Sequence, residues 1–312
     1  MTPSGWTATE MESLDGKTII VTGANSGLGY EATKAFVAHG ADVVLACRSV
    51  ERGEAAATRI RESGVDGSAT VMALDLADLD SIQEFVRSFT TDHDELDILC
   101  NNAGVMAIPR SETADGFETQ FGVNHLGHFA LTGQLLETLL ETEGETRIVT
   151  QSSAVHEQGR IDFEDLHHEK DYDRWAAYGQ SKLANLLFAY ELQRRLDHAD
   201  IGDLVSVACH PGYAATNLQK RGPEQSGSTL RLWLMKAANA LIAQDPEQGA
   251  LPMLYAATEA AVPGGTYVGP GGVGNMRGYP EPQRSSDRSY DEATAERLWS
   301  VSEELTGVTY DL

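Results

Sequence analysis

Residues 17–29 read KTIIVTGANSGLG, a short apolar run followed directly by a glycine-rich turn. The isoleucines, valine and threonines favour extended backbone, so we expect a strand over residues 17–22. Glycines in the turn permit a tight bend and a close approach of the backbone to a bound group. The next stretch has apolar residues at helical spacing and ends at Gly40, which suits a left-handed helix cap. A strand, a glycine turn and a helix in this order favour phosphate binding at the helix N-terminus.

The same alternation of short apolar runs and longer helical stretches continues along the chain. It is typical of βαβ units around a mostly parallel sheet. We expect further strands at residues 43–46, 69–74, 96–100, 148–151, 205–209 and 266–268, with helices at 50–63 and 78–91 and two long helices at 117–140 and 175–196. The sequence therefore predicts an α/β Rossmann fold, a doubly wound sheet of seven parallel strands with helices on both faces.

One core suffices for 312 residues of which 41% are hydrophobic, and we expect a single domain over residues 1–312. Residues 1–15 form an N-terminal extension, and the polar residues 280–312 form a C-terminal extension that wraps around the domain or frays. Residues 222–246 contain an apolar segment after a stretch rich in glycine, proline and serine. A mobile flap over a substrate and an ordinary packing helix fit this segment equally well.

The formal charge is -24, from 47 acidic and 23 basic residues. This charge repels a phosphate backbone, so nucleic acid is excluded as a partner. The acidic residues are scattered over the whole length, as on proteins of salt-loving organisms, where a Debye length of about 3 Å at 1 M salt screens such a surface. An ordinary acidic protein of a mesophile is the alternative.

No stretch approaches the roughly 18 to 20 apolar residues of a membrane span, and the first residues lack the basic and apolar regions of a signal peptide. We therefore expect a cytoplasmic protein without a membrane partner. Three separated cysteines without a C-x-x-C pattern predict buried, reduced thiols at Cys47, Cys100 and Cys209. The histidines at 125, 128, 156, 167 and 168 do not form a convincing metal set, so no metal site is predicted.

Several motifs resemble those of the short-chain dehydrogenase/reductase family. The turn has the spacing G-x-x-x-G-x-G, residues 101–104 read NNAG, and residues 178–182 read YGQSK. Together with Asn124 and Ser153 they occur in family order over about residues 17 to 216. The resemblance implies a dinucleotide-binding catalytic domain that transfers a hydride between nicotinamide and a carbonyl or alcohol, without a metal.

The end of the second strand bears on the choice of nicotinamide cofactor. A carboxylate there would bind the ribose 2′-hydroxyl and repel a 2′-phosphate. The sequence has Arg48 and Ser49 instead, and a guanidinium binds phosphate well. NADP(H) is therefore the preferred cofactor, with NAD(H) possible. The alternative is that Arg48 only caps a surface turn.

The resemblance also implies that Asp75 binds the adenine amino group, that residues 101–104 pass along the adenosine ribose, and that the loop after the sixth strand closes on the nicotinamide. Asp75 as a simple helix-starting residue is the alternative. The candidate cofactor-binding residues are Gly23, Asn25, Ser26, Gly27, Leu28, Gly29, Arg48, Ser49, Asp75, Leu76, Asn102, Ala103, Gly104, Tyr178, Lys182, Pro211, Gly212 and Thr216.

Reduction of a carbonyl needs a proton donor at its oxygen and a second donor to hold that oxygen. Tyr178 and Lys182 are four residues apart and lie on one face of a helix, where the ammonium favours the phenolate. Ser153, at the end of the fifth strand, is expected to hold the carbonyl oxygen, with Ser152 as the alternative. In the family, an asparagine matching Asn124 distorts the long helix and anchors a water leading to the lysine. The predicted catalytic residues are Asn124, Ser153, Tyr178 and Lys182.

The separation of Ser153 from Tyr178, the Ala-Cys-Arg after the second strand and the Tyr-x-x-Ser-Lys pattern resemble the retinol dehydrogenase and WW-domain oxidoreductase branch. This implies lipophilic aldehydes or ketones as substrates. The expected pocket walls are Val105, Met106, His156, Tyr213 and Trp233. A non-catalytic NADP(H)-binding sensor and a light-dependent pigment reductase are the alternative functions. Relatives commonly pair through the two long helices, but the branch includes monomers, so a homo-oligomer is possible.

Overall fold

The computed structural model describes residues 5–64, 66–212 and 245–312. Within them one sheet has the strand order β3-β2-β1-β4-β5-β6-β7-β8. The strands are β1 (Thr18–Thr22), β2 (Asp42–Cys47), β3 (Ser68–Ala73), β4 (Ile98–Asn101), β5 (Thr146–Gln151), β6 (Leu204–Cys209), β7 (Tyr267–Pro270) and β8 (Pro280–Gln283). The first seven pair in parallel, which confirms the predicted doubly wound sheet.

The eighth strand was not expected from the sequence. β8 pairs antiparallel with β7 at the edge of the sheet, and its four residues read PEPQ. Proline cannot donate a ladder hydrogen bond and is tolerated only where one strand edge has no partner. The sequence of β8 therefore carries no strand signal, and its pairing with β7 defines it.

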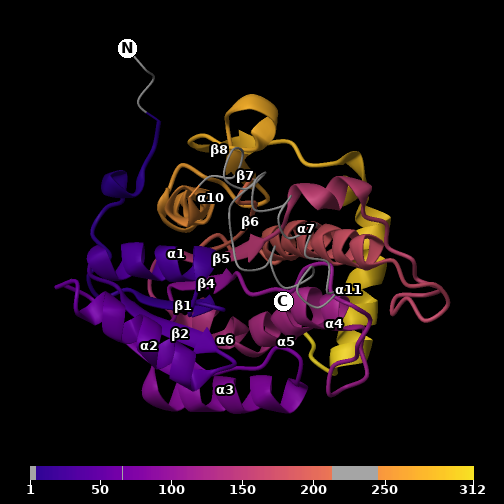
Figure 1. Ribbon diagram of the computed structural model, residues 1–312, viewed down its shortest axis with the longest axis horizontal. Helices are drawn as coiled ribbons and strands as arrows, with labels where there is room; N and C mark the ends of the chain where they lie inside the picture. Colours follow the sequence, from indigo (N-terminus) through magenta and orange to yellow (C-terminus); the bar gives the residue numbers. More distant parts are fainter. Residues whose placement is uncertain (1–4, 65, 213–244) are drawn as a thin grey trace, which may run out of the picture.

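Helices cover both faces of the sheet, as Figure 1 shows. The long ones are α1 (Gly27–Ala38), α2 (Val50–Arg61), α3 (Leu79–Asp92), α7 (Arg174–His198), α10 (Pro246–Thr258) and α11 (Glu292–Thr306). On one face, buried residues of α1, α2 and α10 pack against Ile19 and Val21. On the other face, α3, α5 (Gly127–Gln134) and α7 pack against Ile20. This alternation along β1 is what a central strand buried on both faces requires.

The predicted long helix over 117–140 is interrupted. It consists of α4 (Thr119–Phe121), a π-helical turn η2 (Gly122–Leu126), α5 (Gly127–Gln134) and α6 (Leu136–Glu141). Single π-turns inside helices occur often at functional sites. The four 3₁₀ segments among the described residues are η1 (Ala8–Glu10), η3 (Ala154–Gln158), η4 (Val273–Asn275) and η5 (Asp287–Tyr290).

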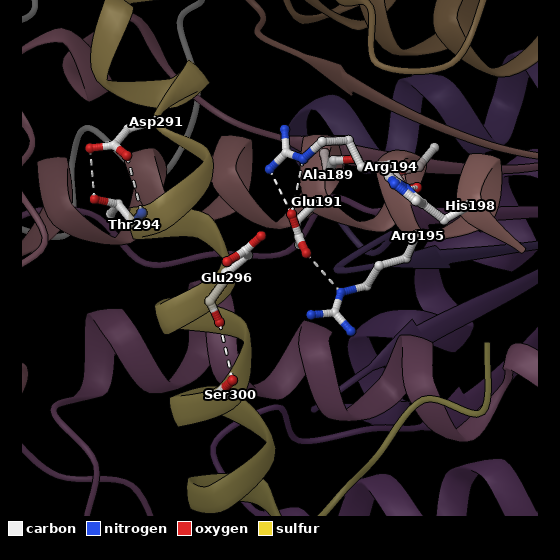
Figure 2. Close-up of polar contacts among 10 residues, drawn as sticks. Ala189, Glu191, Arg194, Arg195, His198, Asp291, Thr294, Glu296 and Ser300 are labelled. Carbon is white, nitrogen blue, oxygen red and sulfur yellow. Dashed lines mark hydrogen bonds and ion pairs between the residues drawn. The ribbon is translucent and has the colours of Figure 1, made fainter.

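The C-terminal extension wraps around the domain. Its helix α11 lies beside α7 (Figure 1) and buries Leu298 and Trp299 against the helices of that face. Figure 2 shows Glu191 of α7 accepting hydrogen bonds from Arg194 and Arg195 of the same helix. The Arg195 guanidinium lies 4.3 Å from the centroid of the Trp299 ring, so this charged cluster also anchors α11.

Candidate active site

A cavity of about 450 Å³ lies at the carboxyl ends of the parallel strands. Its walls come from the segments that follow β1 to β6, because the carboxyl ends of parallel strands share one edge of the sheet. Of the described residues predicted to bind the cofactor, all line it. Thr216 lies outside the described residues, as do Tyr213 and Trp233 and all but the last two residues of the expected flap over 222–246.

The glycine turn after β1 is tied to the segment after β4. The Thr22 hydroxyl oxygen accepts hydrogen bonds of 2.9 Å from the backbone N–H groups of Asn102 and Ala103. The Asn102 side-chain amide donates to the Thr22 carbonyl at 2.7 Å. A Cβ at Gly29 would lie 2.5 Å from this amide nitrogen, so only glycine leaves room for the contact.

Two arginines lie at one end of the cavity. Arg48 follows β2, and Arg52 lies in the first turn of α2; both are exposed and both line the cavity. Ser49, and not Arg48, caps α2, because its hydroxyl oxygen accepts from the Arg52 N–H at 3.4 Å. Sequence reasoning missed Arg52, although its position one helical turn after Arg48 was a usable signal.

Asp75 also lines the cavity, next to Leu76. One of its carboxylate oxygens accepts from the Ala77 N–H at 3.0 Å. The helix cap of α3 is Asp78, which accepts from the N–H groups of Asp80 and Ser81. Asp78 therefore caps α3, and Asp75 does not start this helix as its cap.

At the other end of the cavity, α7 and the end of β5 bring three polar side chains together. The Lys182 Nζ lies 6.0 Å from the centroid of the Tyr178 ring and donates to the Gln151 carbonyl at 3.0 Å. The Ser153 side chain acts on the Tyr178 phenol and lowers its pKa. The Ser152 hydroxyl is buried and donates to the Lys182 carbonyl at 2.8 Å. Of the two serines, Ser153 is thus the one that interacts with the phenol.

Burial changes the acidity of both titratable groups. It raises the pKa of Tyr178 to about 12, while the hydrogen bond with Ser153 acts in the opposite direction. Burial lowers the pKa of Lys182 to about 8. Both shifts have the sign expected when a group leaves water, because desolvation disfavours the charged form.

Asn124 lies in the π-helical turn and does not line the cavity. Its side-chain oxygen accepts from the Val105 N–H at 2.8 Å, and its amide donates to the Val105 carbonyl and the Ser181 hydroxyl, each at 2.9 Å. Asn124 thus connects the segment after β4 to α7. A Cβ on Gly104 would lie 3.0 Å from the Asn124 side-chain oxygen and 3.6 Å from Lys182 Nζ, so the three residues are close together.

Val105 and Met106, two of the expected pocket walls, line the cavity. Trp175 also lines it, is half exposed, and lies edge-on to Tyr178 with ring centroids 6.2 Å apart. It lies one helical turn before Tyr178, a spacing that could have identified it. His156 is buried and is not among the lining residues; its ring contacts the Ser153 carbonyl and the Ser286 N–H instead.

The three cysteines are buried free thiols, as expected. In the described ranges, no group of three or more His, Cys, Asp or Glu side chains is arranged to hold a metal ion. No helix within these ranges is both long and apolar enough to cross a bilayer.

Comparisons with known proteins agree with this geometry. The family model for short chain dehydrogenases matches residues 17–227. Human retinol dehydrogenase 12 is 40% identical over 96% of this chain and 89% of its own length, and human retinol dehydrogenase 13 is 42% identical over 95% and 86%. A crystal structure of a protein from Mycobacterium paratuberculosis is 41% identical with a TM-score of 0.81, covering 99% of this chain and 100% of the other.

A more distant solved structure contains a nucleotide. A protein from Beutenbergia cavernae, described as an NAD(P)-dependent gluconate 5-dehydrogenase with bound NADP, is 27% identical with a TM-score of 0.61. The match covers 80% of this chain and 92% of the other.

Proposed function

The chain belongs to the short chain dehydrogenase family and is an oxidoreductase acting on CH–OH and C=O groups, and we propose that it transfers a hydride between NADP(H) and a lipophilic carbonyl or alcohol. The observation that carries the proposal is the position of Ser153, Tyr178 and Lys182 at one end of the cavity whose other end has the glycine turn and two arginines. One elongated ligand that touches both ends would therefore bring its reactive part to the phenol.

The residues present fit a dinucleotide. The absence of a Cβ at Gly29 lets the Asn102 amide pack against the glycine turn, and the first residues of α1, Gly27 to Gly29, line the cavity, where a helix N-terminus favours phosphate. Bound nicotinamide would supply or accept the hydride. Lys182 would hold the nicotinamide ribose, as the family resemblance implies.

The proton transfer is the task of the chain's own side chains. We assign Tyr178 as the acid that protonates the carbonyl oxygen during reduction, and as the base in the reverse direction. The Lys182 ammonium favours the resulting phenolate, and the Ser153 hydroxyl donates a hydrogen bond to the same substrate oxygen. Asn124 acts as a positioning residue through its bonds to Val105 and Ser181.

The preference for NADP(H) rests on Arg48 and Arg52. Both residues line the cavity and their guanidinium groups would bind a 2′-phosphate, and the residues directly after β2, Arg48 and Ser49, include no carboxylate to repel it. The proposal of a lipophilic substrate rests on the apolar cavity walls Val105 and Met106 and on Trp175, which lies beside the Tyr178 ring. The names of the retinol dehydrogenases that resemble this chain support the same substrate class.

Helix α11 bears on the possible homo-oligomer. It packs against α7, α5 and the π-helical turn, which belong to the two long helices through which relatives commonly pair. We propose that any self-association uses another face. The net charge of -24 argues against nucleic-acid partners.

An assay with purified protein tests the proposal. NADPH or NADH is mixed with a set of aldehydes and ketones from short aliphatic to long-chain and aryl compounds, and oxidation of the cofactor is followed by absorbance. We expect turnover with NADPH, with kcat/KM highest for the large apolar members. Tight NADPH binding without oxidation by any member would contradict the proposal and favour a non-catalytic binding protein.

A further inference from the structure

Two buried histidines lie behind the catalytic end of the cavity without lining it. His156 is in η3, which begins directly after Ser153. His210 follows β6 and directly precedes Pro211 and Gly212. Each is only 2% exposed. Neither has a role in the proposed reaction, although each is next in sequence to residues that line the cavity.

The two bonds of His156 define its tautomer. Its Nδ1 lies 2.7 Å from the Ser153 carbonyl, which can only accept, so Nδ1 carries the hydrogen. Its Nε2 accepts the backbone N–H of Ser286 at 3.1 Å. A protonated ring has no acceptor for that N–H, so only the neutral ring satisfies both partners. Burial lowers the pKa of His156, in the same direction.

His210 has the opposite tautomer. Its Nδ1 accepts the Gly212 N–H at 3.3 Å, so Nε2 carries the hydrogen and donates to the Gln283 side-chain oxygen at 3.0 Å. The Tyr267 ring lies between the histidines, edge-on to His156 with centroids 5.5 Å apart and stacked on His210 at 5.0 Å. The two neutral rings and the tyrosine thus form one packed layer.

Each histidine has one hydrogen-bond partner that is distant in sequence, and both partners belong to residues 280–290. We name this stretch, which contains β8 and η5, the clamp segment. Ser286 bonds His156, and Gln283 bonds His210. Arg288 of the same segment donates to the carbonyls of Glu157 and Gly159, just after His156. The clamp segment therefore holds two of the loops that line the cavity.

We propose that the clamp segment is a positioning element of the active site, which acts through His156 on Ser153 and through His210 on the turn at Gly212. This inference rests on the proposed function of Ser153 and Gly212. Fixing the Ser153 carbonyl fixes the peptide that carries its hydroxyl, and catalytic groups need such support from the residues behind them. The clamp segment is separated from Ser153 by about 130 residues of sequence and reaches it through a single ring.

Ser286 offers a matched pair of variants. Its φ of -64° is the value that proline adopts, so Ser286→Pro removes the N–H donor without imposing a new φ. Its hydroxyl is buried without a hydrogen-bond partner among the described residues, so Ser286→Ala keeps the donor and removes nothing that is bonded. We expect Ser286→Pro to lower kcat about tenfold with KM for NADPH unchanged, and Ser286→Ala to match the wild type.

Titration of His156 provides a readout that does not depend on turnover. Without the Ser286 N–H, Nε2 is free to take a proton, so NMR of ¹⁵N-histidine-labelled Ser286→Pro should show the pKa of His156 rising toward its ordinary value. The groups that face this ring are Glu157, which favours the proton, His210, which opposes it, and the Tyr267 ring. In the wild type and in Ser286→Ala the His156 ring should stay neutral over the pH range in which the ring of Ser286→Pro takes up a proton.

A substitution at Gln283 tests the second contact of the clamp segment, the one through His210. We expect Gln283→Leu to leave kcat nearly unchanged and to weaken NADPH binding severalfold in a fluorescence titration, because His210 loses the partner that orients it toward Gly212. Glu281→Gln, on the same strand but exposed, is the control and should have no effect. The two contacts thus predict separate effects: Ser286→Pro lowers kcat alone, and Gln283→Leu weakens NADPH binding alone.

Equal kinetics for the proline and alanine variants, with an unchanged titration of His156, would overturn the inference. If Ser286→Pro does not fold, His156→Asn and His156→Leu replace it: asparagine keeps a donor near the position of Nδ1 and should retain more of kcat than leucine. Equal losses in both would also overturn it. Failure of the proposed function itself looks different, because the wild type would then bind NADPH and turn over nothing.

Discussion

The two ends of the cavity differ in the burial and the kind of the groups that line them. At the catalytic end, polar side chains are buried and hydrogen-bonded: Tyr178 is 7% exposed, Lys182 4% and Asn124 0%. At the nucleotide end, backbone turns and two exposed guanidinium groups form the surface. Buried charges are shifted in pKa and little screened by salt, whereas exposed charges keep their ordinary state and are screened. Substitutions at the two ends should therefore differ in size and in their response to pH and salt.

The largest effect is expected at Tyr178. Tyr178→Phe removes the proposed acid and keeps the ring, so kcat should fall by about 10³-fold, within the range for loss of a general acid, while NADPH affinity stays within about twofold. Steady-state kinetics and a fluorescence titration measure the two quantities. Tyr30→Phe, on α1 outside the cavity lining, is the control. A comparable loss of cofactor affinity in Tyr178→Phe would remove the distinction between the two ends.

The serine pair sharpens the comparison within the catalytic end. Ser153→Ala should lower kcat by about 100-fold, the cost of one donor to a developing oxyanion. Ser152→Ala should leave kcat nearly unchanged and lower the free energy of unfolding by about 1 kcal/mol, because its hydroxyl bonds the Lys182 carbonyl. Kinetics and urea unfolding of both variants provide the measurement. The reverse pattern would assign the catalytic role to Ser152.

At the nucleotide end, Arg48→Ala should raise KM for NADPH about tenfold or more and leave KM for NADH nearly unchanged, since a charge-assisted bond to phosphate is lost. Arg52→Ala should also raise KM for NADPH, because it removes the second guanidinium of the cavity lining. The measurement is the ratio of kcat/KM for the two cofactors in each variant. Equal effects on NADPH and NADH would show that neither arginine reads the 2′-phosphate.

Much of this site could be predicted because its motifs are local in sequence. The glycine turn, the NNAG segment and the Tyr178–Lys182 pair each depend on neighbours within a few residues, and the strand bounds agree with the structure to within one or two residues. The interruption of the helix at 122–126 was expected only through the family resemblance at Asn124 and not from residue types, because the hydrogen bonds of Asn124 to Val105 and Ser181 come from distant segments.

His156 illustrates the same limit. Its position three residues after Ser153 suggested a pocket wall, but sequence alone does not say on which side of the chain its ring lies. The partner that orients it, Ser286, is 130 residues away and belongs to a polar segment without strand signal. The C-terminal extension was expected to wrap or fray, and only its contacts with α7 and η3 show which residues it holds.

The pH dependence should separate the two ends again. Lysine is charged below its pKa, so the Lys182 ammonium is lost as the pH rises through about 8, whereas burial keeps Tyr178 protonated up to its pKa of about 12. The kcat/KM for NADPH, which reports the free protein, should be constant below pH 8 and fall about tenfold per unit above it. Arg48→Ala should lower the whole curve and keep its shape. A curve that stays flat to pH 10 would contradict the low pKa of Lys182.

The smallest expected effect is that of salt. Added salt should stabilise the fold and weaken NADPH binding at the nucleotide end. Screening reduces repulsion among the 47 acidic residues, so we expect the melting temperature to rise by a few degrees, or about 1–2 kcal/mol of stability, between dilute buffer and 1 M KCl. The same screening weakens the attraction of Arg48 and Arg52 for a phosphate, so the NADPH dissociation constant should rise, while kcat at saturating NADPH stays constant because Tyr178 and Lys182 are buried. Calorimetry and fluorescence titration across the salt series measure the two effects, with sucrose at equal osmolality as the control. A melting temperature that does not respond to KCl would reject the salt-adapted surface, and a kcat that falls in step with NADPH affinity would show that the catalytic end is not shielded from solvent.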